Sequence, residues 1–207
     1  DVEVLIVEDD DQLREYLCRE VGKNFKVIHA ENGKKGLEYT INYMPDIIVS
    51  DILMPETSGF ELSKKLKFEL NTSHIPIIML SAKTNLDDQI KAIEYGADFY
   101  ITKPFSIRYL ITVIKQIVQT RKKLYACLNQ NIYLIPGELT SNELDKKFMQ
   151  KIIDFIMSNI TKDTLDVDEI ANYVGMSRSN LYRKIKALTG KSIVEFIKMV
   201  KLKQAVK

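Results

Sequence analysis

The sequence predicts an α/β fold, a five-stranded doubly wound parallel sheet, followed by a small all-α domain. Five short apolar runs occur in the first 120 residues at a spacing of roughly 25 residues, which suits strand–helix–strand crossovers. Each run is apolar at successive positions, as in parallel strands that are covered on both faces. After residue 141 the apolar residues recur at steps of three and four, which predicts helices.

The expected strands are short and separated by amphipathic stretches; they are residues 2–7, 25–30, 47–50, 75–80 and 99–102. The expected helices of this part are residues 11–22, 34–43, 59–70, 86–95 and 107–120. A linker that begins as an extension of the last helix is expected next, because Pro136 and Gly137 interrupt the pattern. The predicted domains are therefore residues 1–121 and 142–207, with the linker at 122–141.

The predicted all-α part begins with a helix whose apolar face comprises Leu144, Phe148, Ile152, Phe155, Ile156 and Ile160. Two shorter helices are expected at residues 166–174 and 177–188, with Ser177 as the N-cap of the second. A further helix is expected over residues 192–207.

The composition is that of a globular protein, with 45% hydrophobic and 28% charged residues. Neither a membrane-spanning apolar stretch nor a secretory leader is visible, and the two cysteines form no CxxC pair. These features predict a reducing, cytoplasmic setting. The sequence starts at Asp1 without a methionine, two residues before a strand core, so we expect it to be a piece of a longer polypeptide.

The charge of the chain is unevenly distributed along the sequence. Residues 1–140 hold 17 Lys and Arg against 20 Asp and Glu, a net charge of −3, whereas residues 141–207 hold 13 against 8, a net charge of +5. A basic end of this kind is typical of proteins with a polyanionic partner such as DNA. A lysine-rich face that is simply solvated gives the same count, so charge alone leaves both interpretations open.

Polar and charged side chains follow four of the five predicted strands. Glu8 and Asp9 follow the first strand, Asp51 the third, Ser81 the fourth and Lys103 the fifth. In doubly wound sheets ligands bind beyond the carboxyl ends of the strands, near the point where the strand order reverses. The sequence therefore predicts that these five side chains meet at one edge of the sheet.

The chemistry that suits these residues is transfer of a phosphoryl group to the carboxylate of Asp51. The carboxylates of Glu8, Asp9 and Asp51 would repel one another unless a hard divalent cation bridged them, and Mg²⁺ prefers such oxygen ligands. The Lys103 ammonium would neutralise the incoming phosphoryl oxygens, and the Ser81 hydroxyl would hold the product.

Four segments of the chain resemble the response-regulator receiver family: residues 4–10 (VLIVEDD), 45–55 (PDIIVSDILMP), 76–82 (PIIMLSA) and 100–105 (YITKPF). The resemblance implies that Asp51 is phosphorylated from a phosphohistidine, with Mg²⁺ at Glu8 and Asp9. It also implies that the Leu53 carbonyl is a metal ligand and that Pro104 follows a cis peptide bond. Ser81 and Tyr100 match the family's hydroxyl and aromatic switch positions. Glu8 departs from the pattern, since aspartate is more usual at that position.

The basic end of the chain has the spacing of a helix-turn-helix. Ala171 is small where two helices would approach, and Gly175 follows four residues later, just before the second helix. The buried face of the second helix is expected to carry Leu181, Ile185 and Leu188. The side chains expected to meet DNA are Arg178, Ser179, Tyr182, Arg183 and Lys186. On spacing alone, an ordinary helical hairpin with a lysine-rich exterior remains an alternative.

Residues 168–190 also resemble the AraC/XylS transcription-regulator family, and the similarity extends from about residue 142 to residue 207. That family's module has two helix-turn-helix units joined by a long helix. The resemblance implies that residues 142–207 hold the first unit and the start of the joining helix. A receiver, a linker and such a module in this order resemble the C-terminal part of hybrid two-component regulators, in which a histidine kinase precedes the receiver. A free-standing response regulator would have the same sequence here.

Three functions remain open from the sequence. The favoured one is a transcription regulator that phosphorylation of Asp51 switches, with a histidine kinase as donor, DNA as partner and a homodimer as the active form. The second is an Mg²⁺-dependent phosphatase, but Leu53 lies where such enzymes place a second aspartate as general acid, so we expect no enzyme turnover. The third is a receiver that acts as a phosphate sink, with a helical domain that binds protein.

Overall fold

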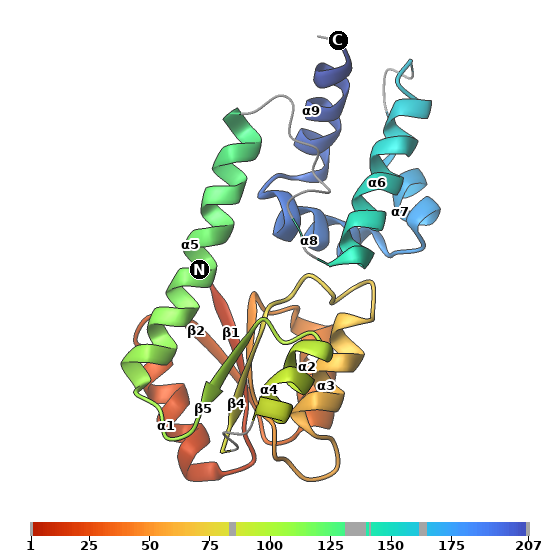
Figure 1. Ribbon diagram of the computed structural model, residues 1–207. Coiled ribbons are helices and arrows are strands. Elements are labelled where there is room, and N and C mark those ends of the chain that lie inside the picture. Colours follow the sequence, from red (N-terminus) through yellow and green to blue (C-terminus); the bar gives the residue numbers. More distant parts are fainter. Residues whose placement is uncertain (1, 83–85, 131–139, 141, 162–164, 206–207) are drawn as a thin grey trace. The chain divides into compact units, whose positions relative to one another are not determined.

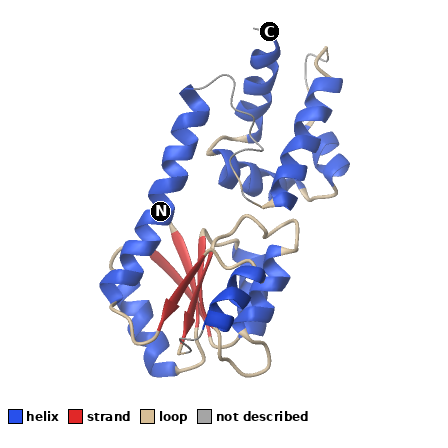
Figure 2. Cartoon of the chain, viewed as in Figure 1, coloured by secondary structure: helices blue, strands red, loops and turns tan. Residues whose placement is uncertain are grey.

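A computed structural model describes residues 2–82, 86–130, 140, 142–161 and 165–205 (Figures 1 and 2). The chain divides into two compact units, Asp1–Val118 and Gln119–Lys207, which are described separately. Among the described residues, no helix has the length and the apolar character that crossing a membrane requires.

Unit 1 is built on a five-stranded sheet in the order β2-β1-β3-β4-β5. The strands are β1 (Glu3–Val7), β2 (Lys26–Ala30), β3 (Ile47–Asp51), β4 (Ile77–Ser81) and β5 (Phe99–Thr102). Every neighbouring pair is parallel. The chain moves from β1 to β2 on one side and then to β3 on the other, so the strand order reverses between β1 and β3. This is where a doubly wound sheet places its ligands, and the predicted fold class of this part is confirmed.

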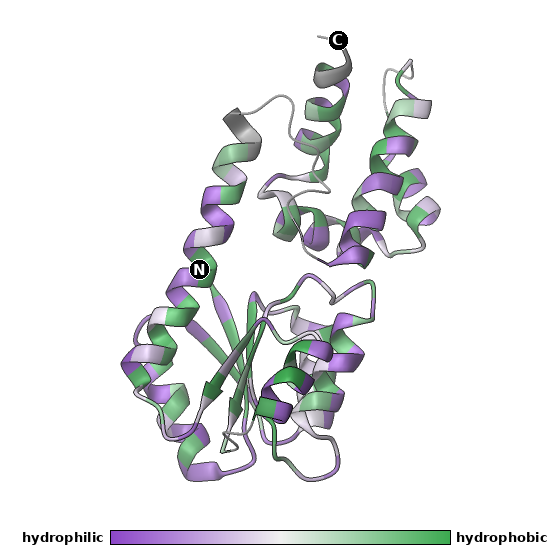
Figure 3. Ribbon diagram, in the orientation of Figure 1, coloured by the Kyte–Doolittle hydropathy of each residue, from purple (hydrophilic) through white to green (hydrophobic). Residues whose placement is uncertain are grey.

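Helices cover both faces of the sheet (Figure 1). They are α1 (Asp11–Gly22), α2 (Gly33–Tyr43), α3 (Gly59–Lys67), α4 (Leu86–Glu94) and α5 (Ile107–Gln130). One buried cluster joins alternate residues of the strands to α1 and α5, and a second joins the other residues to α2, α3 and α4. Because both faces of the sheet are buried, the strands are apolar at successive positions. Figure 3 shows hydrophilic and hydrophobic residues alternating along the helices.

Two predicted boundaries were wrong by more than one residue. The fourth strand begins at Ile77 and not at residue 75, after Pro76, which has no N–H for the sheet. Helix α3 ends at Lys67 and not at residue 70, and the Thr72 hydroxyl then donates to the Leu66 carbonyl in the following turn. Helix α5 continues past residue 120 to Gln130, which confirms that the segment after residue 121 begins as an extension of the last helix; residues 121–130 contain no glycine or proline to end it.

Unit 2 is helical, with α6 (Glu143–Ser158), α7 (Val167–Val174), α8 (Arg178–Thr189) and α9 (Ile193–Ala205). Helix α6 packs against α7 and α9, and α8 packs against the same two helices. The turn between α7 and α8 contains Gly175 in the left-handed conformation at φ 73°, which a glycine adopts without strain. The Ser177 side chain then accepts a hydrogen bond from the Asn180 N–H, which confirms it as the N-cap of α8.

The core of unit 2 contains the expected apolar residues, including Phe148, Ile152, Leu181 and Ile185. It also contains a pair that the sequence pattern did not predict. The Lys184 ammonium lies 2.5 Å from a carboxylate oxygen of Asp145, and both side chains are 0% exposed. The same ammonium lies 5.2 Å from the centre of the Phe148 ring.

Candidate functional site

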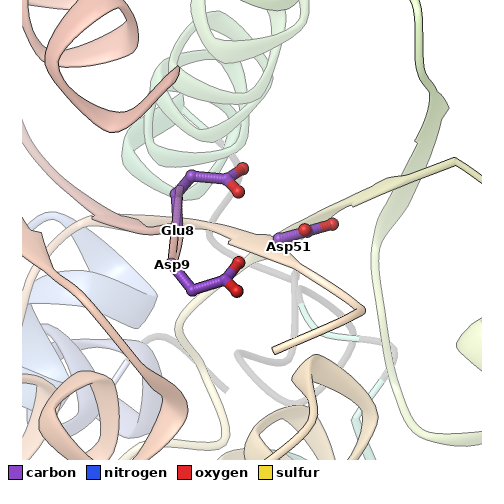
Figure 4. A group of neighbouring side chains, drawn as sticks. All are labelled: Glu8, Asp9 and Asp51. Atoms are coloured by element: carbon purple, nitrogen blue, oxygen red, sulfur yellow. The ribbon is translucent and has the colours of Figure 1, made fainter. Parts of the chain in front are cut away.

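The strongest cluster of polar groups lies at the carboxyl ends of β1 and β3, where the strand order reverses. Glu8 and Asp9 follow β1, and Asp51 is the last residue of β3. Their carboxylate oxygens all lie within 4.8 Å of one another. Figure 4 shows the side chains of Glu8 and Asp9 extending toward the strand that carries Asp51. Glu8 and Asp51 are buried, whereas Asp9 is exposed, so the cluster is reached from solvent on the side of Asp9.

The predicted lysine joins this cluster from β5. The Lys103 ammonium lies 3.0 Å from Glu8 Oε2 and 3.1 Å from Asp51 Oδ2. The other oxygen of Asp51, Oδ1, accepts a hydrogen bond of 2.8 Å from the Ile52 N–H. The peptide bond between Lys103 and Pro104 is cis, as the family resemblance implies. One carboxylate oxygen of Asp51 is thus held by the main chain, and the other faces the ammonium group of Lys103.

The charges of the cluster strongly influence one another. The pKa of Glu8 is raised to about 7: burial and the negative charge of Asp51 raise it, while the hydrogen bond from Lys103 acts in the opposite direction. Burial lowers the pKa of Lys103, but its hydrogen bond to Glu8 and the charge of Asp51 outweigh this effect, so the pKa lies above its ordinary value. The carboxylates are therefore crowded enough that a second source of positive charge would stabilise their ionised forms.

The turn after Asp51 is held close to the strand end by Gly59. The Gly59 N–H donates to the Ile52 carbonyl at 3.0 Å, and a Cβ at this glycine would lie 2.2 Å from the Asp51 carbonyl oxygen. Ser58 and Glu61 form a capping box that starts α3 at this point. Leu53 lies in the same turn, two residues after Asp51, with a side chain that is 51% exposed.

The two predicted switch residues lie on the neighbouring strands. Ser81 is fully buried at the end of β4, one residue beyond the partner of Asp51 in the strand register, and its carbonyl accepts the Lys103 N–H. Tyr100 lies in β5, opposite Met79, and is half-buried against the core under α2, α3 and α4. The structure thus brings Glu8, Asp9, Asp51 and Lys103 into one cluster and places Ser81 and Tyr100 on the strands beside it.

The donor set fits a hard divalent cation. The three side chains offer carboxylate oxygens, the ligand type that Mg²⁺ prefers, and the exposed Asp9 gives the cluster access to the water that this ion keeps as ligands.

Sequence reasoning missed one residue at this site, Arg14 of α1. Its guanidinium donates to the Glu8 carbonyl at 2.7 Å and forms an ion pair with Asp11. A usable signal was present: Arg14 is the first cation after four consecutive acidic residues, and it lies one turn into the helix that those residues start.

Residues 4–115 match the protein family described as "Response regulator receiver domain", which is more than half of the chain. The chain belongs to this family. Receiver domains generally bind Mg²⁺ at an acidic pocket, and this receiver domain has an acidic cluster of Glu8, Asp9 and Asp51. Receiver domains also interact with histidine kinases, which are their phosphoryl donors.

Several known proteins are similar to this chain. It is 35% identical to "Histidine kinase P4" of Formosa agariphila over 98% of the chain but 15% of that protein. It is 39% identical to the "Phosphate regulon transcriptional regulatory protein PhoB" of Pseudomonas aeruginosa, over 56% of the chain and 51% of that protein. The chain thus spans between 15% and about half of the length of these relatives.

Among solved structures, the receiver domain of a signal transduction histidine kinase from Syntrophus aciditrophicus is similar to 57% of this chain. The match covers 91% of that domain, with 32% identity and a TM-score of 0.55.

The residues predicted to meet DNA lie on the surface of unit 2. Arg178, Ser179, Arg183 and Lys186 are exposed on α8, and Tyr182 is half-buried. Arg178 forms an ion pair of 3.0 Å with Asp168 of α7, and its guanidinium lies 5.7 Å from the centre of the Tyr182 ring. Leu181 and Ile185 are buried on the other side of the helix, and Leu188 is half-buried. The predicted division of α8 into a buried and an exposed face is confirmed.

Proposed function

We propose that the chain is a phosphorylation-switched transcription regulator in which Asp51 accepts a phosphoryl group from a phosphohistidine and thereby controls DNA binding by unit 2. The observation that carries the proposal is the buried carboxylate of Asp51, held between the Lys103 ammonium and the acid pair Glu8 and Asp9. The similarity to a histidine kinase over nearly the whole chain, and to a transcriptional regulatory protein over the receiver, supports the phosphorylation-controlled half of the proposal.

In the proposed reaction, an oxygen of the Asp51 carboxylate attacks the phosphorus of the phosphohistidine. The phosphorus–nitrogen bond breaks, and its electron pair returns to the imidazole nitrogen of the donor. Lys103 neutralises charge on the phosphoryl oxygens, since its ammonium already contacts Asp51. Glu8, Asp9, Asp51 and the Leu53 carbonyl would hold Mg²⁺, which supplies further positive charge to those oxygens.

The chain accepts the phosphoryl group but does not turn over substrate. Leu53 has an apolar side chain where aspartyl phosphatases place a general acid, so no side chain at that position assists a leaving group. Many turnovers per chain on p-nitrophenyl phosphate would contradict this part of the proposal.

Phosphorylation would then draw the Ser81 hydroxyl toward the phosphoryl group and turn Tyr100 inward, which changes the surface near β5. We propose that two chains associate through this altered surface and place two helix-turn-helix units of the AraC/XylS type on paired half-sites of DNA. The three-residue turn between α7 and α8 and the exposed Arg183 and Lys186 on α8 support this reading of unit 2.

The phosphoryl step is tested by labelling the chain with acetyl phosphate and Mg²⁺. Asp51→Asn should abolish the label and any dimerisation that depends on it, whereas Asp87→Asn, at an exposed aspartate of α4, should leave both unchanged. Normal labelling of Asp51→Asn would refute the assignment of the acceptor.

The DNA step is tested by fluorescence anisotropy on a duplex of random sequence at several salt concentrations. Loss of one phosphate contact in Arg183→Ala should weaken binding and lower the slope of log K against log salt by about 1. Lys147→Ala, at an exposed position of α6, serves as the control. Binding that does not respond to salt, or an Arg183→Ala variant equal to the control, would contradict the role of α8.

A further inference from the structure

Arg14 contacts the main chain of the acid pair from α1. Its Nη1 donates to the Glu8 carbonyl at 2.7 Å and lies 3.4 Å from the Asp9 carbonyl oxygen. Its Nη2 pairs with the carboxylate of Asp11. The side chain is 13% exposed, so the guanidinium is held among these groups and is not a solvated surface charge.

The segment that Arg14 contacts carries an unusual concentration of negative charge. Residues 8–11 are four consecutive acids, and two of them must point their carboxylates into one pocket. Lys103 offsets part of this charge, but it does so at the carboxylate of Glu8. Arg14 acts on the other side of the same residues, at their carbonyl oxygens. The two cations therefore have different tasks.

The geometry of the contact requires an arginine. A guanidinium presents several N–H groups in a fixed plane, so it can bind two carbonyl oxygens and a carboxylate together, whereas a lysine ammonium acts as a point charge on a flexible stem. The start of α1 is anchored at the same place, since the Asp10 carboxylate caps the helix by accepting from the Leu13 N–H at 2.8 Å. The main-chain N–H of Arg14 also donates to the Asp10 carbonyl. The turn from β1 to α1 is thus fixed by its main chain on both sides of Asp9.

We propose that Arg14 is a positioning residue for the metal-binding acid pair: by holding the carbonyls of Glu8 and Asp9, it directs both carboxylates toward Asp51. This inference rests on the proposed function, because it assumes that the acid pair binds Mg²⁺. It has a specific consequence at Glu8, whose longer side chain has more rotational freedom than an aspartate and therefore gains more from a fixed main chain.

The test uses three variants of the whole chain: Arg14→Met, Arg14→Lys and Arg19→Met. Arg19 lies on the same helix with a side chain that is 68% exposed, so its replacement controls for loss of a cation from α1. Two quantities are measured: the dissociation constant for Mg²⁺ by titration calorimetry of the unphosphorylated chain, and the rate of labelling by acetyl phosphate against Mg²⁺ concentration. Far-UV circular dichroism establishes that each variant is folded.

Loss of a group that orients metal ligands typically weakens metal binding 10- to 100-fold, so Arg14→Met should raise the Mg²⁺ dissociation constant by about 10-fold or more. Arg14→Lys should lie between this variant and the wild type. At saturating Mg²⁺ the labelling rate of each variant should return to within about twofold of the wild-type rate, because Asp51 and Lys103 are untouched. Arg19→Met should match the wild type throughout.

Three results would overturn the inference. The first is an Mg²⁺ dissociation constant for Arg14→Met equal to that of Arg19→Met. The second is a labelling rate that stays low at saturating Mg²⁺, which would show a general defect of the site. The third applies if Arg14→Met does not fold: the test then depends on Arg14→Lys, and a wild-type Mg²⁺ dissociation constant for this variant would overturn the inference. A wild-type chain that neither binds Mg²⁺ nor accepts the label would instead refute the proposed function.

Discussion

Asp145→Asn should severely destabilise unit 2. The substitution removes the negative partner of Lys184, whose side chain is 0% exposed and whose ammonium lies 2.5 Å from the carboxylate. At this distance and an effective dielectric constant of about 20, the attraction between the two charges is about 7 kcal/mol. Removing both ions from water costs several kcal/mol each, so the pair as a whole contributes little net stability. Removing one partner of a buried ion pair costs about 3–5 kcal/mol.

The expected loss of stability distinguishes this buried pair from a surface ion pair, which contributes at most about 1 kcal/mol. For a domain of 60–100 residues each kcal/mol lowers the melting temperature by about 4–8 °C, so Asp145→Asn should lower it by about 12 °C or more. Lys184→Met should have a similar effect, because it removes the ammonium that pairs with the buried Asp145 carboxylate. Scanning calorimetry of the whole chain measures both, and the transition of unit 1 should not move.

The double variant Asp145→Leu/Lys184→Met supplies the control. It replaces both ions by apolar side chains of similar size, a change that is often neutral or stabilising in other proteins. Its loss of stability should therefore be several kcal/mol smaller than the sum of the two single losses. A loss below about 1 kcal/mol in Asp145→Asn, or a double variant equal to the sum of the singles, would refute the reasoning.

Two further predictions concern Gly190 and Gly59, where an added Cβ would meet other parts of the chain. Gly175 and Gly190 both have φ near +70°, where an alanine costs about 1–2 kcal/mol. A Cβ at Gly190 would also lie 2.7 Å from the Tyr125 ring, whereas a Cβ at Gly175 would meet no atom within 4 Å. Gly190→Ala should therefore lower the melting temperature of unit 2 more than Gly175→Ala, and equal losses would contradict the contact. Gly59→Ala should slow Mg²⁺-dependent labelling of Asp51 on the order of 100-fold, because its Cβ would displace the turn beside the acceptor. Gly22→Ala, where the nearest atom would be 4.0 Å away, should label at the wild-type rate.

The sheet and the acidic cluster could be predicted because they depend on features that a sequence displays directly. Runs of apolar residues show that a strand is covered on both faces, and the residue after each run lies at the edge where the strands end together. The cluster includes Glu8 and Lys103, which are 95 positions apart in the sequence, and the parallel topology brings them together with Asp9 and Asp51. No measured distance was needed to place these four in one site.

Helix limits were less predictable because they depend on competition between local signals. Helix α5 was expected to extend into the linker from residue 121, but the sequence did not indicate how far, because charged side chains such as those of residues 121–123 favour a helix as much as they favour a linker. Helix α3 was expected to reach residue 70, but the Thr72 hydroxyl takes the Leu66 carbonyl and ends it earlier. A hydrogen bond from a side chain to the main chain can end a helix or leave it to continue, and the tertiary packing decides between the two.

Lys184 shows what a charge pattern conceals in unit 2. Charged residues are assumed to be exposed, and counting from Tyr173 onward gives nine Lys and Arg against Glu195. One of those nine is neutralised inside the core by Asp145, and Arg178 at the start of α8 is paired with Asp168. The positive charge that α8 presents to solvent is therefore carried chiefly by Arg183 and Lys186. If α8 meets DNA, these two residues dominate its electrostatic contribution, and Lys184 contributes by fixing the helix that carries them.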